Sequence, residues 1–220
     1  MAELIHGLHA ARVAANLAEV RAEIDAACTR AGRGAAAVDV LAAVKYVPTE
    51  ELAVLADAGI TLVGENRAQD LVAKAQAHPG RFTFDFIGHL QSRKVRQILP
   101  HVRWIHSVAS DSVLEQLARH APPGTEVLVE VNIAGEAGKS GIAPDELEAF
   151  IARCPVTVVG LMTMPPLAAD AQASRPWFAR LAELAAANGL RELSMGTTQD
   201  FAVAVEEGAT IVRVGTRLYR

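Results

Sequence analysis

The sequence predicts a single α/β domain built as a (β/α)8 barrel of the TIM type, with one extra helix at its N-terminus. Short apolar runs alternate with longer amphipathic segments through most of the chain, and there are eight such runs. This alternation is typical of a parallel sheet, and eight units in 220 residues favour a closed barrel over an open doubly wound sheet. No Gly-x-Gly-x-x-Gly segment follows the first run. We therefore expect residues 1–220 to form one barrel domain.

The apolar runs have the composition of strands that are buried on both faces. Several are rich in Val and Ile, and they are continuous rather than alternating, as in parallel strands covered by helices. The eight predicted strands are Val38–Val44, Ile60–Val63, Phe82–Ile87, Trp104–Val108, Val127–Ile133, Val156–Met162, Leu190–Met195 and Ile211–Val214.

Helical spacing precedes the first strand and fills the segments between strands. The extra helix is predicted from an apolar stripe at every third or fourth position, and Gly32 and Gly34 end it. The stripe consists of Val13, Leu17, Val20, Ile24 and Cys28. Further helices are expected at Thr49–Ala58, Asn66–Ala77, Gln91–Leu99, Ser110–His120, Pro144–Ala152 and Ala171–Asn188.

Charge and composition exclude several classes of protein. The formal net charge is −4 and the pI about 6.0, so the basic footprint of a nucleic-acid-binding protein is missing. No apolar run approaches the ~20 residues that span a bilayer, and Met1–His9 does not read as a signal peptide. Cys28 and Cys154 lie far apart and form no metal-binding pattern. We expect a cytoplasmic protein without a membrane, nucleic-acid or metal partner.

Lys45 follows the first predicted strand. In a βα barrel the site lies at the carboxyl ends of the strands, so this lysine would stand at its edge. A lysine in apolar surroundings loses solvation, which favours the neutral amine that forms Schiff bases with aldehydes. The alternative is a strand-end lysine whose ammonium extends into water.

Two Gly-Thr segments follow the last two predicted strands. They are Gly196–Thr198 and Gly215–Thr216. Small residues let backbone N–H groups approach an anion, hydroxyls add further donors, and the loops after strands seven and eight of a barrel often bind phosphate. The alternative is that these glycines only make tight turns.

Arg213 interrupts the apolar run of the eighth predicted strand. Inside the barrel it would need an acceptor such as a heteroaromatic nitrogen or a carboxylate. The alternative is an outward arginine that pairs with Glu206 or Glu207. A Schiff-base lysine, a phosphate cup and a buried arginine together match the needs of pyridoxal 5′-phosphate.

The chain resembles the pyridoxal phosphate homeostasis protein family, whose barrel is similar to the N-terminal domain of alanine racemase. The resemblance runs through nearly the whole chain, and its segments occur in order. They are Ala43–Lys45 with Pro48, Gly64–Asn66 with Gln69, Phe86–Gly88 with Leu90–Ser92 and Lys94, Lys139–Gly141, Gly160–Met162, Ser194–Gly196 with Asp200, and Val212–Arg213 with Gly215–Thr216.

The resemblance implies a role for each residue of a cofactor site. Lys45 would carry the aldimine and Arg213 would face the pyridine nitrogen. The phosphate would be held by Gly196, Thr198, Gly215 and Thr216, and the ring pocket lined by Asn66 and Met195. The chain departs from the family pattern at Tyr46, Val47, Asp85, Arg93 and Thr197–Thr198. Thr198 keeps a hydroxyl, so phosphate binding should persist.

Three functions compete: a cofactor carrier, an amino-acid racemase that uses the cofactor, and a Schiff-base aldolase without cofactor. The resemblance implies that a racemase takes its second base from another domain, whereas this chain ends five residues after Gly215. An arginine facing the ring nitrogen also disfavours protonation of that nitrogen and weakens the ring as an electron sink. The aldolase leaves Arg213 without a role. We therefore expect a monomeric carrier that is not an enzyme, with cofactor-requiring apo-enzymes as partners.

The remaining polar residues near the predicted site are expected to be inert. Tyr46 adjoins Lys45 and should point away from it, since neighbouring strand residues face opposite sides. His89 and His106 are placed at strand ends, where no second histidine or carboxylate is spaced with them as a metal pair.

Overall fold

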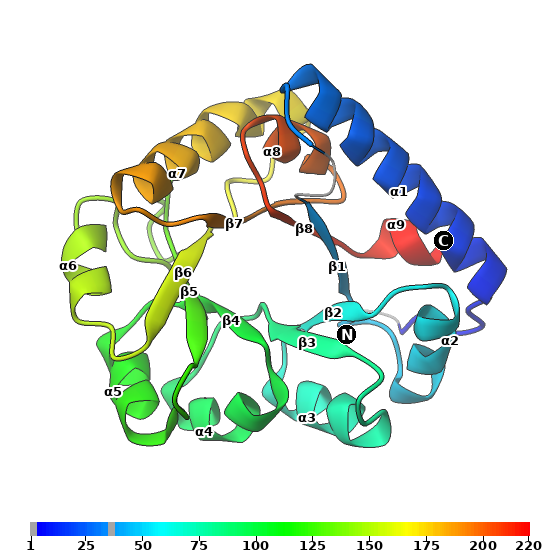
Figure 1. Cartoon of the computed structure of the whole chain (residues 1–220), viewed down its shortest axis with the longest axis horizontal. Coiled ribbons are helices and arrows are strands. Elements are labelled where there is room, and N and C mark those ends of the chain that lie inside the picture. Colours follow the sequence, from blue (N-terminus) through cyan, green and yellow to red (C-terminus); the bar gives the residue numbers. More distant parts are fainter. Residues whose placement is uncertain (1–3, 35–37) are drawn as a thin grey trace.

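The computed structural model describes residues 4–34 and 38–220, and it confirms the predicted barrel. Within these ranges eight parallel strands close in chain order, β1 to β8. Closure comes from the pairing of β1 with β8, in which Asp39 lies opposite Ile211 and Ala42 opposite Val214. Figure 1 looks into this ring of strands, with the helices arranged around it. Three residues of the predicted N-terminal segment Met1–His9, namely 1–3, lie outside the described residues.

All eight predicted strands are confirmed, with ends that differ from the prediction by up to three residues. The strands are β1 Asp39–Ala43, β2 Leu62–Glu65, β3 Thr83–Phe86, β4 Trp104–Val108, β5 Glu126–Glu130, β6 Thr157–Met162, β7 Glu192–Thr197 and β8 Ile211–Val214.

Helices cover the outside of the barrel. They are α1 Ala10–Arg30, α2 Leu52–Asp57, α3 Ala68–Ala77, α4 Val95–Ile98, α5 Asp111–His120, α6 Leu147–Ala152, α7 Arg175–Ala187, α8 Phe201–Glu206 and α9 Thr216–Tyr219. The sequence pattern did not single out α8 or α9. Most residues of α8 are buried, so this helix lacks the contrast between an apolar and a polar face that marks a helix in the sequence. Helix α9 is a single turn. No helix in the described part of the chain has the length and apolar character needed to cross a membrane.

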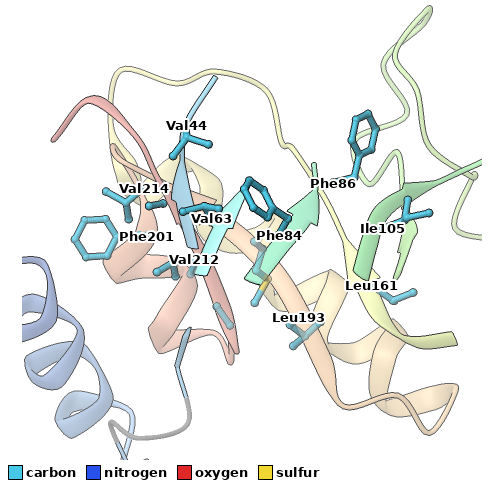
Figure 2. Packing of buried hydrophobic residues seen from close by; sticks show 14 of the residues in the cluster. Val44, Val63, Phe84, Phe86, Ile105, Leu161, Leu193, Phe201, Val212 and Val214 are labelled. Carbon is cyan, nitrogen blue, oxygen red and sulfur yellow. The ribbon is translucent and has the colours of Figure 1, made fainter. Parts of the chain in front are cut away.

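Strand alternation divides the apolar residues into two cores. The larger core lies between strands and helices, and Figure 2 shows part of it, with Phe201 of α8 beside Val212 and Val214 of β8. A few buried apolar side chains stand apart from this core, and their strand positions direct them into the barrel. They are Leu41, Leu128, Met162 and Ile211. On β8 this parity also directs Arg213 inward.

Helix α1 covers the seam where the barrel closes. It packs on α8 and α9, as Figure 1 shows. The amide of Asn16 donates to the backbone carbonyls of Leu218 and Arg220 at 3.2 and 2.8 Å. The segment before α1 is fastened beside β1, because the backbone N–H of Ile5 donates to the Tyr46 carbonyl at 2.8 Å. Helix α1 and the segment before it therefore pack against α9 and the end of β1, next to the predicted site.

Candidate cofactor site

The predicted site residues gather where β1, β2, β7 and β8 meet. Lys45 lies in the turn after β1 and Asn66 directly after β2. Thr198, Gly215 and Thr216 follow β7 and β8. Neighbouring pairing brings these ends together, since β1 pairs with both β2 and β8, and β8 pairs with β7. The structure therefore places residues that are far apart in the sequence around one edge of the barrel mouth.

Lys45 is exposed, in agreement with the alternative of a strand-end lysine that extends into water, and the apolar surrounding considered for it is wrong. Strand β1 ends at Ala43, and a turn follows in which the backbone N–H of Val47 donates to the Val44 carbonyl at 3.0 Å. Lys45 therefore lies beyond the end of β1, outside the apolar surroundings of that strand. The ammonium nitrogen lies 5.1 Å from the centroid of the Tyr46 ring, so the prediction that Tyr46 points away from Lys45 is wrong. In a turn, neighbouring residues need not alternate between faces.

Buried polar groups hold the backbone directly before Lys45. Lys74 of α3 donates to the Val44 carbonyl at 2.6 Å and forms a buried ion pair with Glu65 of β2. The hydroxyl of Tyr219 in α9 donates to the Ala43 carbonyl at 3.2 Å. Burial raises the pKa of Tyr219, and Glu65 raises it further, so this phenol stays protonated. The lysine thus projects from a backbone segment that other elements fix.

A cup of small residues and hydroxyls lies where the loops after β7 and β8 meet. Gly196 has a φ of +88°, and an added Cβ would lie 2.6 Å from the Cβ of Ala204, so only glycine fits. Asp200 closes the loop after β7, because its carboxylate accepts from the backbone N–H of Thr197 at 2.7 Å. Thr198 is joined to Gly215, whose backbone N–H donates to the threonine hydroxyl at 3.3 Å. The two predicted Gly-Thr segments therefore lie next to each other and form one cup.

A cavity of about 240 Å³ opens beside this cup. Its walls include Gly196 and Thr197 on one side and Met164 and Lys139 on the other. The cavity therefore borders the loop after β7, with Asp200 also in its wall.

Arg213 points into the barrel and is 6% exposed, so the alternative of an outward arginine is wrong. Glu206 and Glu207, the partners of that alternative, pair with Arg175 instead. Burial lowers the pKa of Arg213 to about 10, and the charges of Asp200 and Glu130 counteract this fall. The guanidinium remains a cation at neutral pH, directed toward the mouth from the inside.

Asn66 and Met195 differ in burial and in the side of the barrel on which their side chains lie. Asn66 is exposed, and its backbone packs so closely on Gly88 that a Cβ there would lie 2.2 Å from the Asn66 carbonyl oxygen. Met195 is fully buried in the core between strands and helices, since Ser194 before it points into the barrel. The Met195 side chain therefore lies on the outer side of β7, away from the predicted ring pocket.

Comparison with known proteins identifies the family. The model for the N-terminal domain of alanine racemase matches residues 11–220. A pyridoxal phosphate homeostasis protein from Aquifex aeolicus (strain VF5) is 38% identical over 217 residues, covering 92% of this chain and 95% of that protein. The chain belongs to the pyridoxal phosphate homeostasis protein family.

Solved structures of this family share the whole barrel. The structure of PipY from Synechococcus elongatus PCC7942 with PLP bound has 31% sequence identity and a TM-score of 0.78, and the match covers 94% of this chain and all of that one. An alanine racemase from Corynebacterium glutamicum matches with a TM-score of 0.72 at 16% identity, over 99% of this chain and 63% of the racemase. At that identity the second likeness shows only a common fold.

In this homeostasis-family chain, the inside of the barrel also holds a polar cluster that the sequence did not reveal. His106 is fully buried in the middle of β4, so its predicted place at a strand end is wrong. Its Nδ1 lies 2.8 Å from the Ser194 hydroxyl and its Nε2 lies 3.0 Å from Asp85. Single polar residues at inward positions of apolar strands are the signal that would have found this cluster.

Metal ligation has no support in residues 4–34 and 38–220. No group of three or more His, Cys, Asp or Glu side chains is arranged to hold a metal ion there. His89 follows β3 and is exposed.

Proposed function

We propose that this chain binds pyridoxal 5′-phosphate at the mouth of its barrel, with Lys45 as the residue of covalent attachment. The observation that carries this proposal is Arg213, a buried cation that points into the barrel from β8, beside the loops that Thr198 and Gly215 join. Both terminal nitrogens of Arg213 have acceptors in the protein, and its Nε remains to donate to a ligand. A ring nitrogen above it and a phosphate in the cup would use the groups that this mouth presents.

The residues present fit the cofactor at each of its three polar ends. The exposed amine of Lys45 is accessible to an aldehyde. Gly196 and Gly215 bring backbone close to the cup, with the hydroxyl of Thr198 in the loop after β7 and that of Thr216 at the start of α9. Asn66 would flank the ring. Met195 would contribute through its backbone alone, because its side chain lies in the outer core.

We propose further that the chain carries the cofactor rather than using it as an enzyme. When bound, the cofactor supplies a ring that withdraws electrons from a substrate carbanion, most strongly when its nitrogen is protonated. Arg213 is itself protonated at neutral pH and would oppose that protonation. Tyr219 does not offer a second base, because its hydroxyl is buried and donates to the Ala43 carbonyl.

The names of the relatives agree with a carrier, since they refer to pyridoxal phosphate homeostasis. Delivery of the cofactor to apo-enzymes that require it belongs to the same proposal. So does a monomeric state within one domain, which is supported because every proposed site residue comes from one barrel. The free thiols of Cys28 and Cys154 fit a reducing cytoplasm.

Absorbance spectroscopy with borohydride reduction tests the proposal. Purified protein mixed with pyridoxal phosphate should gain a visible band, and reduction followed by peptide mass mapping should place the adduct on Lys45. Lys45→Ala should lose both signals, whereas Lys139→Ala, a control lysine at the neighbouring cavity, should keep them. An adduct that persists in Lys45→Ala would remove Lys45 from the site. Racemisation of alanine by wild type loaded with pyridoxal phosphate, measured by chiral chromatography, would show that the chain is an enzyme and contradict the carrier proposal.

A further inference from the structure

We propose that Asp85 and His106 are positioning residues for Arg213. Through the Ser194 hydroxyl they fix the direction of a hydrogen-bond chain across the barrel, and this chain leaves the arginine with one N–H to offer at the mouth. The inference rests on the proposed function, because it concerns the residue that would face the cofactor's ring nitrogen.

The chain begins at Asp85, a buried carboxylate on β3 whose acceptor sites are filled. One oxygen accepts from Nε of Arg103 at 3.0 Å and from the backbone N–H of Trp104 at 3.2 Å. The other accepts from the second guanidinium nitrogen of Arg103 at 2.5 Å and faces His106. Burial raises the pKa of Asp85, but the bonds from His106 and Arg103 outweigh it and leave this pKa below its usual value. Asp85 is therefore an ionised acceptor.

An ionised acceptor decides which nitrogen of His106 carries the proton. Burial lowers the pKa of His106 against the opposing effect of Asp85, so the ring is neutral at neutral pH. A neutral ring has one donor and one acceptor nitrogen, and the nitrogen that faces the carboxylate must be the donor. The proton thus lies on Nε2, and Nδ1 accepts from the hydroxyl of Ser194.

The direction of the Ser194 hydroxyl then determines how Arg213 is held. With its hydrogen given to His106, the Ser194 oxygen accepts from one terminal nitrogen of Arg213 at 2.6 Å. That nitrogen also donates to the Ser194 carbonyl, and the other terminal nitrogen donates to the Thr163 carbonyl at 2.8 Å and to Sδ of Met164 at 2.9 Å.

These contacts engage four of the five N–H groups that a guanidinium carries. The N–H on Nε donates to no partner among the described residues. Nε is also not among the fully buried atoms that lack a hydrogen-bond partner, so it is not sealed off completely. It is the donor that remains for a ligand at the mouth.

The variant Asp85→Asn provides a sharp test, because an amide oxygen and an NH2 group replace two equivalent oxygens. The amide oxygen must turn to Arg103 Nε and Trp104 N, which can only donate. The NH2 group then faces the second guanidinium nitrogen of Arg103, which loses its acceptor there, and His106, the one neighbour that can change from donor to acceptor. We expect the proton of His106 to move to Nδ1, so that the Ser194 hydroxyl loses its acceptor.

Nitrogen-15 NMR of the side chains in cofactor-free protein measures this tautomer. His106→Gln assigns the His106 signals among the seven histidines. Wild type should show the Nε2–H form and Asp85→Asn the Nδ1–H form. The control is Asp39→Asn, which removes the other carboxylate on Arg103, at 3.3 Å, without touching His106, and this variant should keep the Nε2–H form.

Fluorescence titration with pyridoxal phosphate measures the consequence for Arg213. Asp85→Asn should weaken binding roughly tenfold, as expected for the loss of one hydrogen bond to a charged group, and Asp39→Asn should not. Ser194→Ala, which removes the link alone, should weaken binding to a similar extent while the Nε2–H form persists. The double variant Asp85→Asn/Ser194→Ala should show no further loss, because both changes break the same chain.

Two results would overturn the inference: an Nδ1–H form in wild type, or a tautomer change in Asp85→Asn that leaves binding unchanged. Either can occur in protein that binds the cofactor normally. A wild type that takes up no cofactor would instead refute the proposed function, while its His106 tautomer would still be measurable.

Discussion

The hydroxyl of Thr198 accepts a hydrogen bond from the backbone N–H of Gly215 at 3.3 Å and so connects the loop after β7 with the loop after β8. These residues are 17 positions apart in the sequence. The bond brings a hydroxyl and a glycine backbone to one point of the barrel mouth, where an anion would meet both.

Replacing Thr198 should separate this hydroxyl from the rest of the cup. Thr198→Val keeps the shape and removes the donor, so we expect pyridoxal phosphate affinity to fall about tenfold or more, as for a lost hydrogen bond to a charged group. Thr198→Ser keeps the hydroxyl and should bind nearly as wild type in the same fluorescence titration. Equal affinities for the two variants would place the phosphate elsewhere.

Gly196 should tolerate no side chain. Gly196→Ala combines a positive φ with a Cβ that would lie 2.6 Å from Ala204 and 2.9 Å from the Cα of Phe201. We expect the free energy of unfolding, measured in urea, to fall by about 3 kcal/mol or more. Gly124→Ala is the matched control, because Gly124 has a φ of +82° and open space around it. It should cost only the strain, about 1 kcal/mol. Equal losses would mean that α8 moves aside freely.

The ion pair of Lys74 and Glu65 should be needed for stability. The side chains are 5% and 0% exposed, so Lys74→Met would leave a buried carboxylate without its cation and free the Val44 carbonyl. We expect a loss of about 3–5 kcal/mol in the free energy of unfolding. Arg81→Met breaks an ion pair with Asp57 whose side chains are 45% and 57% exposed, and it should cost less than about 1 kcal/mol. Chemical denaturation of both variants gives the comparison, and similar losses would contradict it.

His106 should make the fold less stable in mild acid. Its pKa in the folded chain is lowered, chiefly by burial, whereas the unfolded chain has an ordinary histidine that titrates near about 6.5. Below that pH the unfolded state binds a proton on His106, whereas the folded state keeps this histidine neutral down to a lower pH. The free energy of unfolding therefore decreases as the pH falls, by at most about 1.4 kcal/mol per pH unit. The stabilisation is fully present above about pH 6.5.

Urea denaturation at pH 8 and pH 5.5 measures this effect. His106→Gln should show a smaller decrease than wild type between the two pH values. The lowered pKa of Asp85 adds a similar decrease in stronger acid, below its ordinary value of 3.8. An identical decrease in wild type and His106→Gln would show that His106 is not the group responsible.

Much of the fold could be predicted from the sequence because strand burial leaves a direct mark on composition. β4 and β8 were predicted to the residue, since each is a run of mainly apolar residues with clear turn residues around it. Arg213 was recognised for the same reason: a charged residue inside such a run is conspicuous. α8 was missed because helices buried on most sides lose the periodicity that identifies them.

The site was harder to predict because its contacts depend on closure of the ring. Asp85, His106 and Ser194 come from β3, β4 and β7, and no spacing along the chain indicates that they meet. The environment of Lys45 depends on β1 ending at Ala43, one residue before the predicted end, which composition does not reveal. Sequence reasoning therefore identified single unusual residues, whereas their partners required the three-dimensional structure.

The pairing of β1 with β8 has a consequence for how the protein is made. Lys45 emerges early in synthesis, but the strand that completes its surroundings ends at Val214, and the loop that binds Thr198 follows only at Gly215. A nascent chain therefore carries the lysine before the arginine and the cup have been made. Capture of a reactive aldehyde in the finished geometry becomes available only when the last strand joins the first.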